Sequence, residues 1–218
     1  MFDVTIDQLP LIGVNLSSAL FNMRSTNDTQ SLVAFYSLLQ NGIQTFTLEL
    51  EERNNMWMVP KTNITFSDFL TTFQTFINAT DDNLSANVLV LLLNISSNTR
   101  LNATRNSTKY SVASPTNISD SSTNITYLLD QDMGRQRIYT PEDLANDRST
   151  GSTFNVSGLN NSGWPKLETF LYLTKRRLLI AELTNNLDQQ TPYIFDSSVL
   201  YFDKGNASLS SPNTTDDY

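Results

Sequence analysis

The segment Gly42-Ile43-Gln44-Thr45-Phe46-Thr47-Leu48-Glu49-Leu50-Glu51-Glu52 decides the fold of this chain. Its apolar residues are closely spaced and favour a β-strand, and three carboxylates stand at its end. A segment with helical spacing precedes it, and Gly42 gives the stop signal between the two. In parallel α/β folds, sites form at the C-terminal ends of strands. The segment therefore predicts a buried strand whose last residues are the first place to look for chemistry.

Strands and helices alternate along the rest of the chain. Apolar runs predict further strands at residues 11–16, 88–93 and 178–183. Helical spacing and capping signals predict helices at about 30–41, capped by Asp28 or Thr29, at 67–78 and at 141–148, the last capped by Thr140. A further helix is expected after Gly163-Trp164-Pro165, ending at the basic triplet Lys175-Arg176-Arg177.

Repeated β-then-α units predict a parallel sheet with right-handed crossovers. A closed eight-stranded barrel needs about 250 residues, and the four strands predicted here are about half of its strands. We therefore expect one α/β domain over residues 1–218, the first half of a TIM-type barrel. Residues 95–126, rich in Ser, Thr and Asn, are expected to form a polar, glycosylated insertion, and residues 209–218 a flexible tail.

The composition excludes several function classes. The 22 acidic residues outnumber the 14 Lys and Arg, for a net charge of −8, so direct nucleic-acid binding is not expected. The chain has no cysteine and no histidine, which removes the thiolate nucleophile and the commonest proton-transfer group near neutral pH. The sequence shows neither a signal-peptide pattern at its start nor an apolar run long enough to cross a membrane.

Asparagine supplies the signal for a cellular compartment. The chain contains 14 Asn-x-Ser/Thr sequons, whereas its 24 Asn and 50 Ser and Thr among 218 residues would give about 5.5 by chance. We expect N-glycosylation in a secretory lumen, with the signal peptide outside these residues. The expected sites are Asn27, Asn63, Asn78, Asn83, Asn94, Asn102, Asn106, Asn117, Asn124, Asn155, Asn160, Asn206 and Asn213, and less so Asn15, because it ends a core strand.

Several segments resemble the fungal maintenance of telomere capping protein 6 family. They are Thr5-Ile6-Asp7-Gln8-Leu9-Pro10 with Gly13 and Asn15-Leu16, Leu91-Leu92-Leu93-Asn94-Ile95-Ser96, Gly163-Trp164-Pro165-Lys166-Leu167, Ala181-Glu182-Leu183-Thr184 and Pro192-Tyr193-Ile194-Phe195. The resemblance spans residues 3–208. It implies the lumenal part of a single-pass type I membrane glycoprotein whose membrane anchor lies outside this chain.

The same segments are similar, more loosely, to phosphatidylinositol phospholipase C-like phosphodiesterase barrels. That similarity implies a Gly-x-His signature at the end of the first strand and a functional carboxylate on the second. Here the matching positions are Gly13-Val14-Asn15 and either Glu49 or Glu51. A primary amide such as Asn15 does not titrate usefully, so it cannot transfer the proton. The resemblance therefore supports the fold rather than the activity.

Three carboxylates remain as candidate metal ligands. Glu49 and Glu51 are two residues apart and so lie on one side of a strand, and Glu182 ends a later strand. They could gather around a divalent cation, or Glu49 could pair with a basic side chain while Glu51 lies in a solvated turn. Arg176 and Arg177 are interpreted as helix-ending charges rather than an anion site, and Trp57 and Trp164 as packing residues.

Two functions remain open. The first is a non-catalytic lumenal domain, without a cofactor, that contacts an unidentified protein partner and affects telomere capping indirectly. The second is a metal-assisted phosphodiesterase that acts on a lipid or glycerol phosphodiester. The absence of histidine favours the first.

Overall fold

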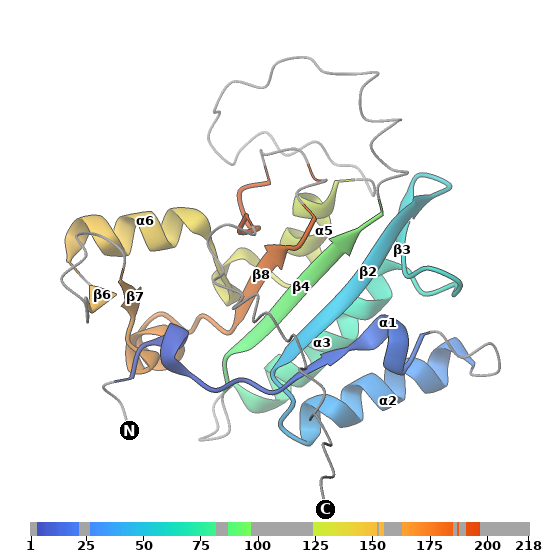
Figure 1. The fold of residues 1–218 in the computed structure, drawn as a ribbon, viewed down its shortest axis with the longest axis horizontal. Helices are drawn as coiled ribbons and strands as arrows, with labels where there is room; N and C mark the ends of the chain where they lie inside the picture. Colours follow the sequence, from blue (N-terminus) through green and yellow to red (C-terminus); the bar gives the residue numbers. More distant parts are fainter. Residues whose placement is uncertain are drawn as a thin grey trace, which may run out of the picture.

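The computed structural model describes residues 4–21, 27–81, 87–96, 124–151, 153–154, 163–184, 187 and 191–196. Its centre is a parallel sheet in the order β1-β2-β4-β8-β5, to which β3 adds antiparallel beside β2 (Figure 1). The strands are β1 (Gly13–Asn15), β2 (Thr45–Arg53), β3 (Met56–Met58), β4 (Leu89–Ile95), β5 (Ile138–Tyr139) and β8 (Leu178–Glu182). A separate two-stranded sheet joins β6 (Thr153–Phe154) to β7 (Trp164–Pro165).

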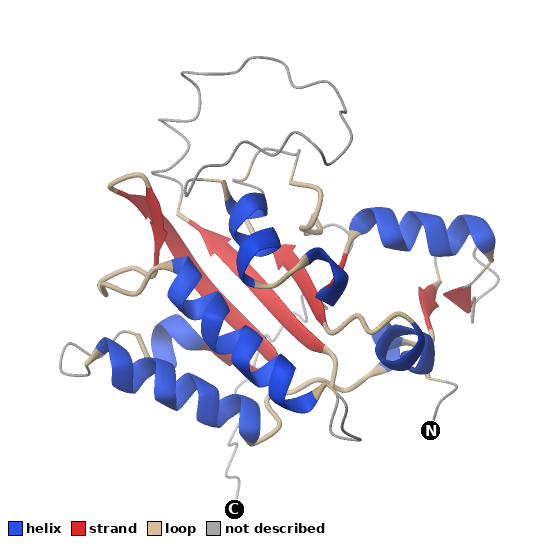
Figure 2. Cartoon of the chain, turned by 180° about the vertical axis from the view of Figure 1, so that it is seen from behind, coloured by secondary structure: helices blue, strands red, loops and turns tan. Residues whose placement is uncertain are grey.

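Helices α2, α3 and α5 cover one face of the sheet, as Figure 2 shows from behind. The helical elements are η1 (Ile6–Gln8), α1 (Leu16–Ala19), α2 (Asp28–Gln40), α3 (Phe66–Thr80), α5 (Ile125–Asp132), η4 (Arg135–Arg137), α6 (Pro141–Thr150) and the π-helical η5 (Thr169–Leu173). Among the described residues, no helix combines the length and apolarity needed to cross a bilayer.

Polar caps and glycines set the helix ends. The Thr65 and Thr140 side chains each accept a hydrogen bond from the N–H three residues on, completing capping boxes at α3 and α6. The predicted cap of α2 was wrong by one or two positions, because Asn27 Oδ1 accepts from the Thr29 N–H at 3.2 Å. Gly42, with φ of 83°, adopts the left-handed conformation that lets the chain turn from α2 into β2.

An aromatic cluster holds the helices against the sheet. Phe35 of α2 stacks on Phe69 of α3 with ring centroids 4.5 Å apart and meets Phe46 of β2 edge-on at 5.1 Å. Phe73 contacts all three rings, and all four side chains are fully buried. Such pairs add to the hydrophobic gain of burial, so this cluster fixes α2 and α3 on β2.

A second core covers the opposite face of β4 and β8. Val90, Leu92, Leu179 and Ala181 belong to one buried cluster with side chains from η1, α6, β7 and η5 and with the segment that follows β8: Ile6, Leu144, Trp164, Phe170, Leu171 and Phe195. Strands β4 and β8 are therefore buried on both sides, which explains their unbroken apolar sequences.

All four predicted strands are present, and they form the predicted parallel sheet with helices packed on it. Sequence patterns missed β3, the two-residue β5 and the helix α5. They also missed the strand order, in which β8 lies between β4 and β5 although β5 precedes it in the chain.

The predicted bounds of the insertion, 95–126, include residues of β4 and α5, so they are too wide at both ends. Ile95 is the buried last residue of β4, while Ile125 and Thr126 are buried at the start of α5. The expected helix near 141–148 extends to Thr150. The predicted tail at 209–218 lies outside the described residues.

Candidate functional site

The C-terminal ends of β1, β2 and β4 carry a row of polar side chains on one face of the sheet. In the parallel register, Asn15 lies beside Thr47, and Glu49 lies beside Asn94. Since residues in register point to the same face and a strand alternates with period two, Glu51 joins them. We call Asn15, Thr47, Glu49, Glu51 and Asn94 the strand-end row. It occupies the position where barrel enzymes place their chemistry.

Two features set the local structure of the strand-end row. The Glu49 N–H donates to Ser17 Oγ at 3.0 Å, which ties β2 to the start of α1. Asn15 Oδ1 accepts from the Ser18 N–H at 3.1 Å and thereby caps α1. The residue at the position of the expected histidine therefore has a clear structural role as a helix cap.

Glu182 does not join the strand-end row, so the convergence of three carboxylates is not found. Its register partner is Leu93, which belongs to the core between the sheet and helices α2 and α3, here called the helix-side core. Glu182 therefore faces the opposite side of the sheet from Glu49. The side chain is buried, and its Oε1 accepts from the Leu187 N–H at 2.8 Å and from Thr184 Oγ1 at 3.2 Å. Glu182 thus ties Thr184 and Leu187 to the end of β8.

Glu49 and Glu51 do lie on one side of β2, as their spacing predicts. Neither forms an ion pair within the described part of the chain, so pairing of Glu49 with a basic side chain is not observed there. Glu51 lies in β2 opposite Met58 of β3, where a solvated turn was the alternative. The described residues contain no group of three or more Asp, Glu, His or Cys that could hold a metal ion.

Arginine and aspartate side chains form two networks that the sequence did not reveal. Asp143 accepts two hydrogen bonds of 3.0 Å from Arg135 and one of 3.2 Å from Arg176. Asp81 pairs with Arg137 and lies 3.8 Å from Nη1 of Arg177. Arg176 and Arg177 therefore have structural partners. Both come after Thr174, the C-cap of η5, so they do not end the helix as the sequence predicted.

These contacts perturb the pKa of the groups involved. The hydrogen bond from Arg137 holds the pKa of Asp81 below its usual value, against the effect of burial. Burial raises the pKa of Asp143, but hydrogen bonds from Arg135 and Thr140 outweigh it, and the net pKa is lowered. Both carboxylates are thus kept ionised.

Two buried tyrosines in the described part of the chain are further candidates for proton transfer. Burial and the hydrogen bond to Asp147, at 2.7 Å, raise the pKa of Tyr139. Burial and Asp130 raise the pKa of Tyr193 to about 12. Because both phenols stay protonated near neutral pH, neither serves as a general base there.

The two tryptophans pack in the interior. Trp57 of β3 is buried in the helix-side core, and Trp164 of β7 lies 5.7 Å from Phe195 and 6.4 Å from Tyr139, measured between ring centroids. Neither ring offers an exposed face for stacking on a sugar.

Six sequon asparagines lie in the described residues. Asn15, Asn27, Asn63 and Asn78 are exposed, whereas Asn94 and Asn124 are half-buried. Asn15, Asn27 and Asn124 cap helices through Oδ1, which leaves their Nδ2 atoms, the point of glycan attachment, free of that bond. The other expected sites, Asn83, Asn102, Asn106, Asn117, Asn155, Asn160, Asn206 and Asn213, lie outside the described residues.

Comparison with known proteins shows the family. Residues 1–218 match the family model described as the MTC6 partial TIM-barrel domain. "Maintenance of telomere capping protein 6" of Zygosaccharomyces rouxii is 48% identical over 218 residues, which cover 99% of this chain and 40% of that protein. The Saccharomyces cerevisiae protein of the same name is 40% identical over 223 residues, again 99% and 40% of the two chains. That of Vanderwaltozyma polyspora is 34% identical over 232 residues, 98% and 44% of the two.

The chain thus spans about 40% of the length of the first two relatives. The predicted resemblance is confirmed over the whole sequence, and it agrees with the parallel sheet and its covering helices. This chain belongs to the MTC6 partial TIM-barrel family.

Proposed function

We propose that this chain is a non-catalytic interaction domain in the lumenal part of a membrane glycoprotein, and that it contributes indirectly to telomere capping. The names of the relatives support the link to telomere capping. The excess of sequons supports a lumenal location. A lumenal domain is separated from chromosomes by a membrane, so its effect on them passes through a partner.

One observation carries the non-catalytic assignment. Asn15, at the position where the similar phosphodiesterase barrels place a histidine, caps α1 through its Oδ1. Phosphodiester cleavage without a metal needs a group that accepts and then returns a proton, and an amide does neither. The sequence contains no histidine that could take this role from another position.

Glu49 and Glu51 favour the second candidate, a metal-assisted phosphodiesterase. They lie on one face of β2 at its C-terminal end, without an ion-pair partner among the described residues. Two carboxylates leave most of the six to eight oxygen positions around Ca²⁺ to other ligands. Asn15 and Asn94 are the nearest candidates in the strand-end row, and both are neutral.

Calorimetric titration with Ca²⁺, Mg²⁺ and Mn²⁺, together with a phosphodiester turnover assay, tests the two candidates. We expect no micromolar binding and no turnover, in this chain and in the full lumenal region. Glu49→Gln removes a carboxylate of the strand-end row, and Glu52→Gln is the matched control because it alternates to the other face of β2. Turnover that Glu49→Gln abolishes and Glu52→Gln retains would establish the enzyme, and micromolar binding with the same pattern would establish a metal site in the strand-end row.

Glycan mapping tests the lumenal location. The exposed Asn27, Asn63 and Asn78 are expected to carry glycans in the protein as its own cells produce it. Asn94 is half-buried within β4 and serves as the internal comparison. The measurement is mass spectrometry of peptides before and after glycosidase treatment, on the protein isolated from its fungal host. Unmodified asparagines throughout the chain would overturn the lumenal assignment.

A further inference from the structure

Basic side chains gather at the N-terminal end of the parallel strands, whereas the strand-end row lies at their C-terminal end. Nine Lys and Arg lie in the described residues, and five of them fall in two short segments, 135–137 and 175–177. The first segment precedes β5 and the second precedes β8, so both lie at the N-terminal ends of neighbouring parallel strands. In an acidic chain this is a local concentration of positive charge.

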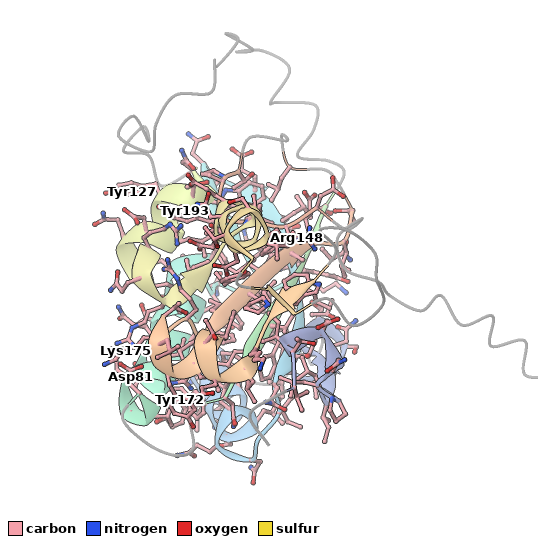
Figure 3. All side chains as sticks on the ribbon, turned by 90° about the vertical axis from the view of Figure 1, so that its left-hand side faces the viewer. Asp81, Tyr127, Arg148, Tyr172, Lys175 and Tyr193 are labelled. Atoms are coloured by element: carbon pink, nitrogen blue, oxygen red, sulfur yellow. The ribbon has the colours of Figure 1, made fainter. Side chains whose placement is uncertain are left out.

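A pocket of about 380 Å³ opens at this end of the strands, lined by Asp81, Gln136, Arg137, Leu173, Thr174 and Lys175. Figure 3 shows Lys175 and Asp81 next to each other on this side of the molecule, away from Tyr127 and Tyr193. The volume falls in the range of small-molecule sites, about 300–1,000 Å³.

The charges around the pocket are unequal. Arg137, Lys175 and the buried Arg177 lie at or beside it, and Asp81 is the one carboxylate among the lining residues. These four side chains together carry two more positive than negative charges. This excess is complementary to a phosphate monoester, which is close to a dianion at neutral pH.

Hydrogen-bond donors remain available to such a ligand. Lys175, exposed and held at a positive φ of 52°, forms no hydrogen bond or ion pair within the described part of the chain. Arg177 donates to the Asn87 carbonyl at 3.0 Å and to Thr80 Oγ1 at 3.1 Å, which leaves Nη1 buried without a hydrogen-bond partner beside Asp81. The fixed guanidinium therefore adds its field to the pocket without being free to move.

We propose that this pocket binds a small phosphate monoester, with Lys175 and Arg137 contacting the phosphate. Arg177 stabilises the bound anion from behind as a fixed charge, and Leu173, exposed at the rim, contacts the organic part. The site lies at the opposite end of the strands from the strand-end row, so it stands or falls independently of the non-catalytic assignment.

Lys175→Gln tests the proposal, and Lys61→Gln is its matched control. Lys61 is also an exposed lysine at positive φ, 64°, but it lies in the turn between β3 and α3. Both variants remove one positive charge from an exposed left-handed position. Binding of inorganic phosphate and of glycerol 2-phosphate is measured by calorimetry and by NMR shifts of the Lys175 amide.

We expect saturable binding of both probes, tighter for glycerol 2-phosphate because of Leu173. Lys175→Gln should weaken it at least tenfold, while Lys61→Gln should change it less than twofold. Absence of saturable binding, or an equal loss in both variants, would overturn the proposal. Tighter binding of inorganic phosphate than of glycerol 2-phosphate would overturn the assignment of a monoester.

Discussion

Phe35→Ala is expected to lower the free energy of unfolding by about 3–5 kcal/mol. The Phe35 ring is fully buried and contacts Phe46, Phe69 and Phe73, one on the sheet and two on α3. Removing it deletes the ring's transfer free energy and leaves a cavity where three elements meet. The neighbouring rings are fixed on β2 and α3, so they cannot fully collapse into that space.

Urea or guanidinium unfolding at neutral pH measures this loss. Val33→Ala is the matched control, because Val33 lies on the same helix, half a turn away, with 61% of its side chain exposed. We expect the control to change stability by less than about 0.5 kcal/mol. Equal effects of the two substitutions would show that α2 does not pack through Phe35.

The order of helices and strands could be predicted because its signals are local. Strands β4 and β8 are apolar runs, β2 alternates polar and apolar residues, and α3 and α6 begin with capping boxes that the sequence spells out. The helix α5 carried a signal as well. Asn124 caps apolar residues at helical spacing, Ile125, Leu128 and Leu129, but it stands at the end of a long Ser/Thr/Asn-rich region that obscures it.

The face of each strand was predictable only where polar and apolar residues alternate. Strand β2 alternates, so Glu49 and Glu51 were placed on one side correctly. The five residues of β8 are all buried, and an unbroken apolar run carries no information on which residue faces which layer. The orientation of Glu182 depends on the register of β8 against β4, a non-local property.

Non-local contacts also explain why the sequence did not predict strand β5 and the burial of Arg177. The two residues of β5 form a strand only because β8 lies beside them, some forty positions later in the chain. The burial of Arg177 needs both Asp81 and the carbonyl of Asn87, neither of which is near in sequence. A basic triplet after a helix is ordinarily solvated, so its sequence favoured the exposed interpretation.

Asp143→Asn is expected to cost about 2–4 kcal/mol, because Asp143 holds together elements from three parts of the chain. Its carboxylate accepts from Arg135, Arg176 and Thr140, joining η4, the start of β8 and the cap of α6. The amide leaves two guanidinium groups without their counter-charge. This range lies about 1 kcal/mol lower than the 3–5 kcal/mol of a fully buried pair, since the Arg135 side chain is 32% exposed.

The lowered pKa of Asp143 also fixes how this contribution depends on pH. A carboxyl whose folded-state pKa lies below its unfolded value, about 3.9, contributes its full stability above that pH. The contribution is lost as pH falls through the folded-state pKa, when the native carboxylate itself takes up a proton. The gap in unfolding free energy between the wild type and Asp143→Asn should therefore be constant from pH 7 to about pH 5 and narrow below about pH 4. Glu142→Gln makes the same charge change at an exposed neighbouring position in the first turn of α6. Its free energy of unfolding should fall with decreasing pH as that of the wild type does. A gap between wild type and Asp143→Asn that stays constant down to pH 2 would show that the carboxylate's charge does not hold the network together.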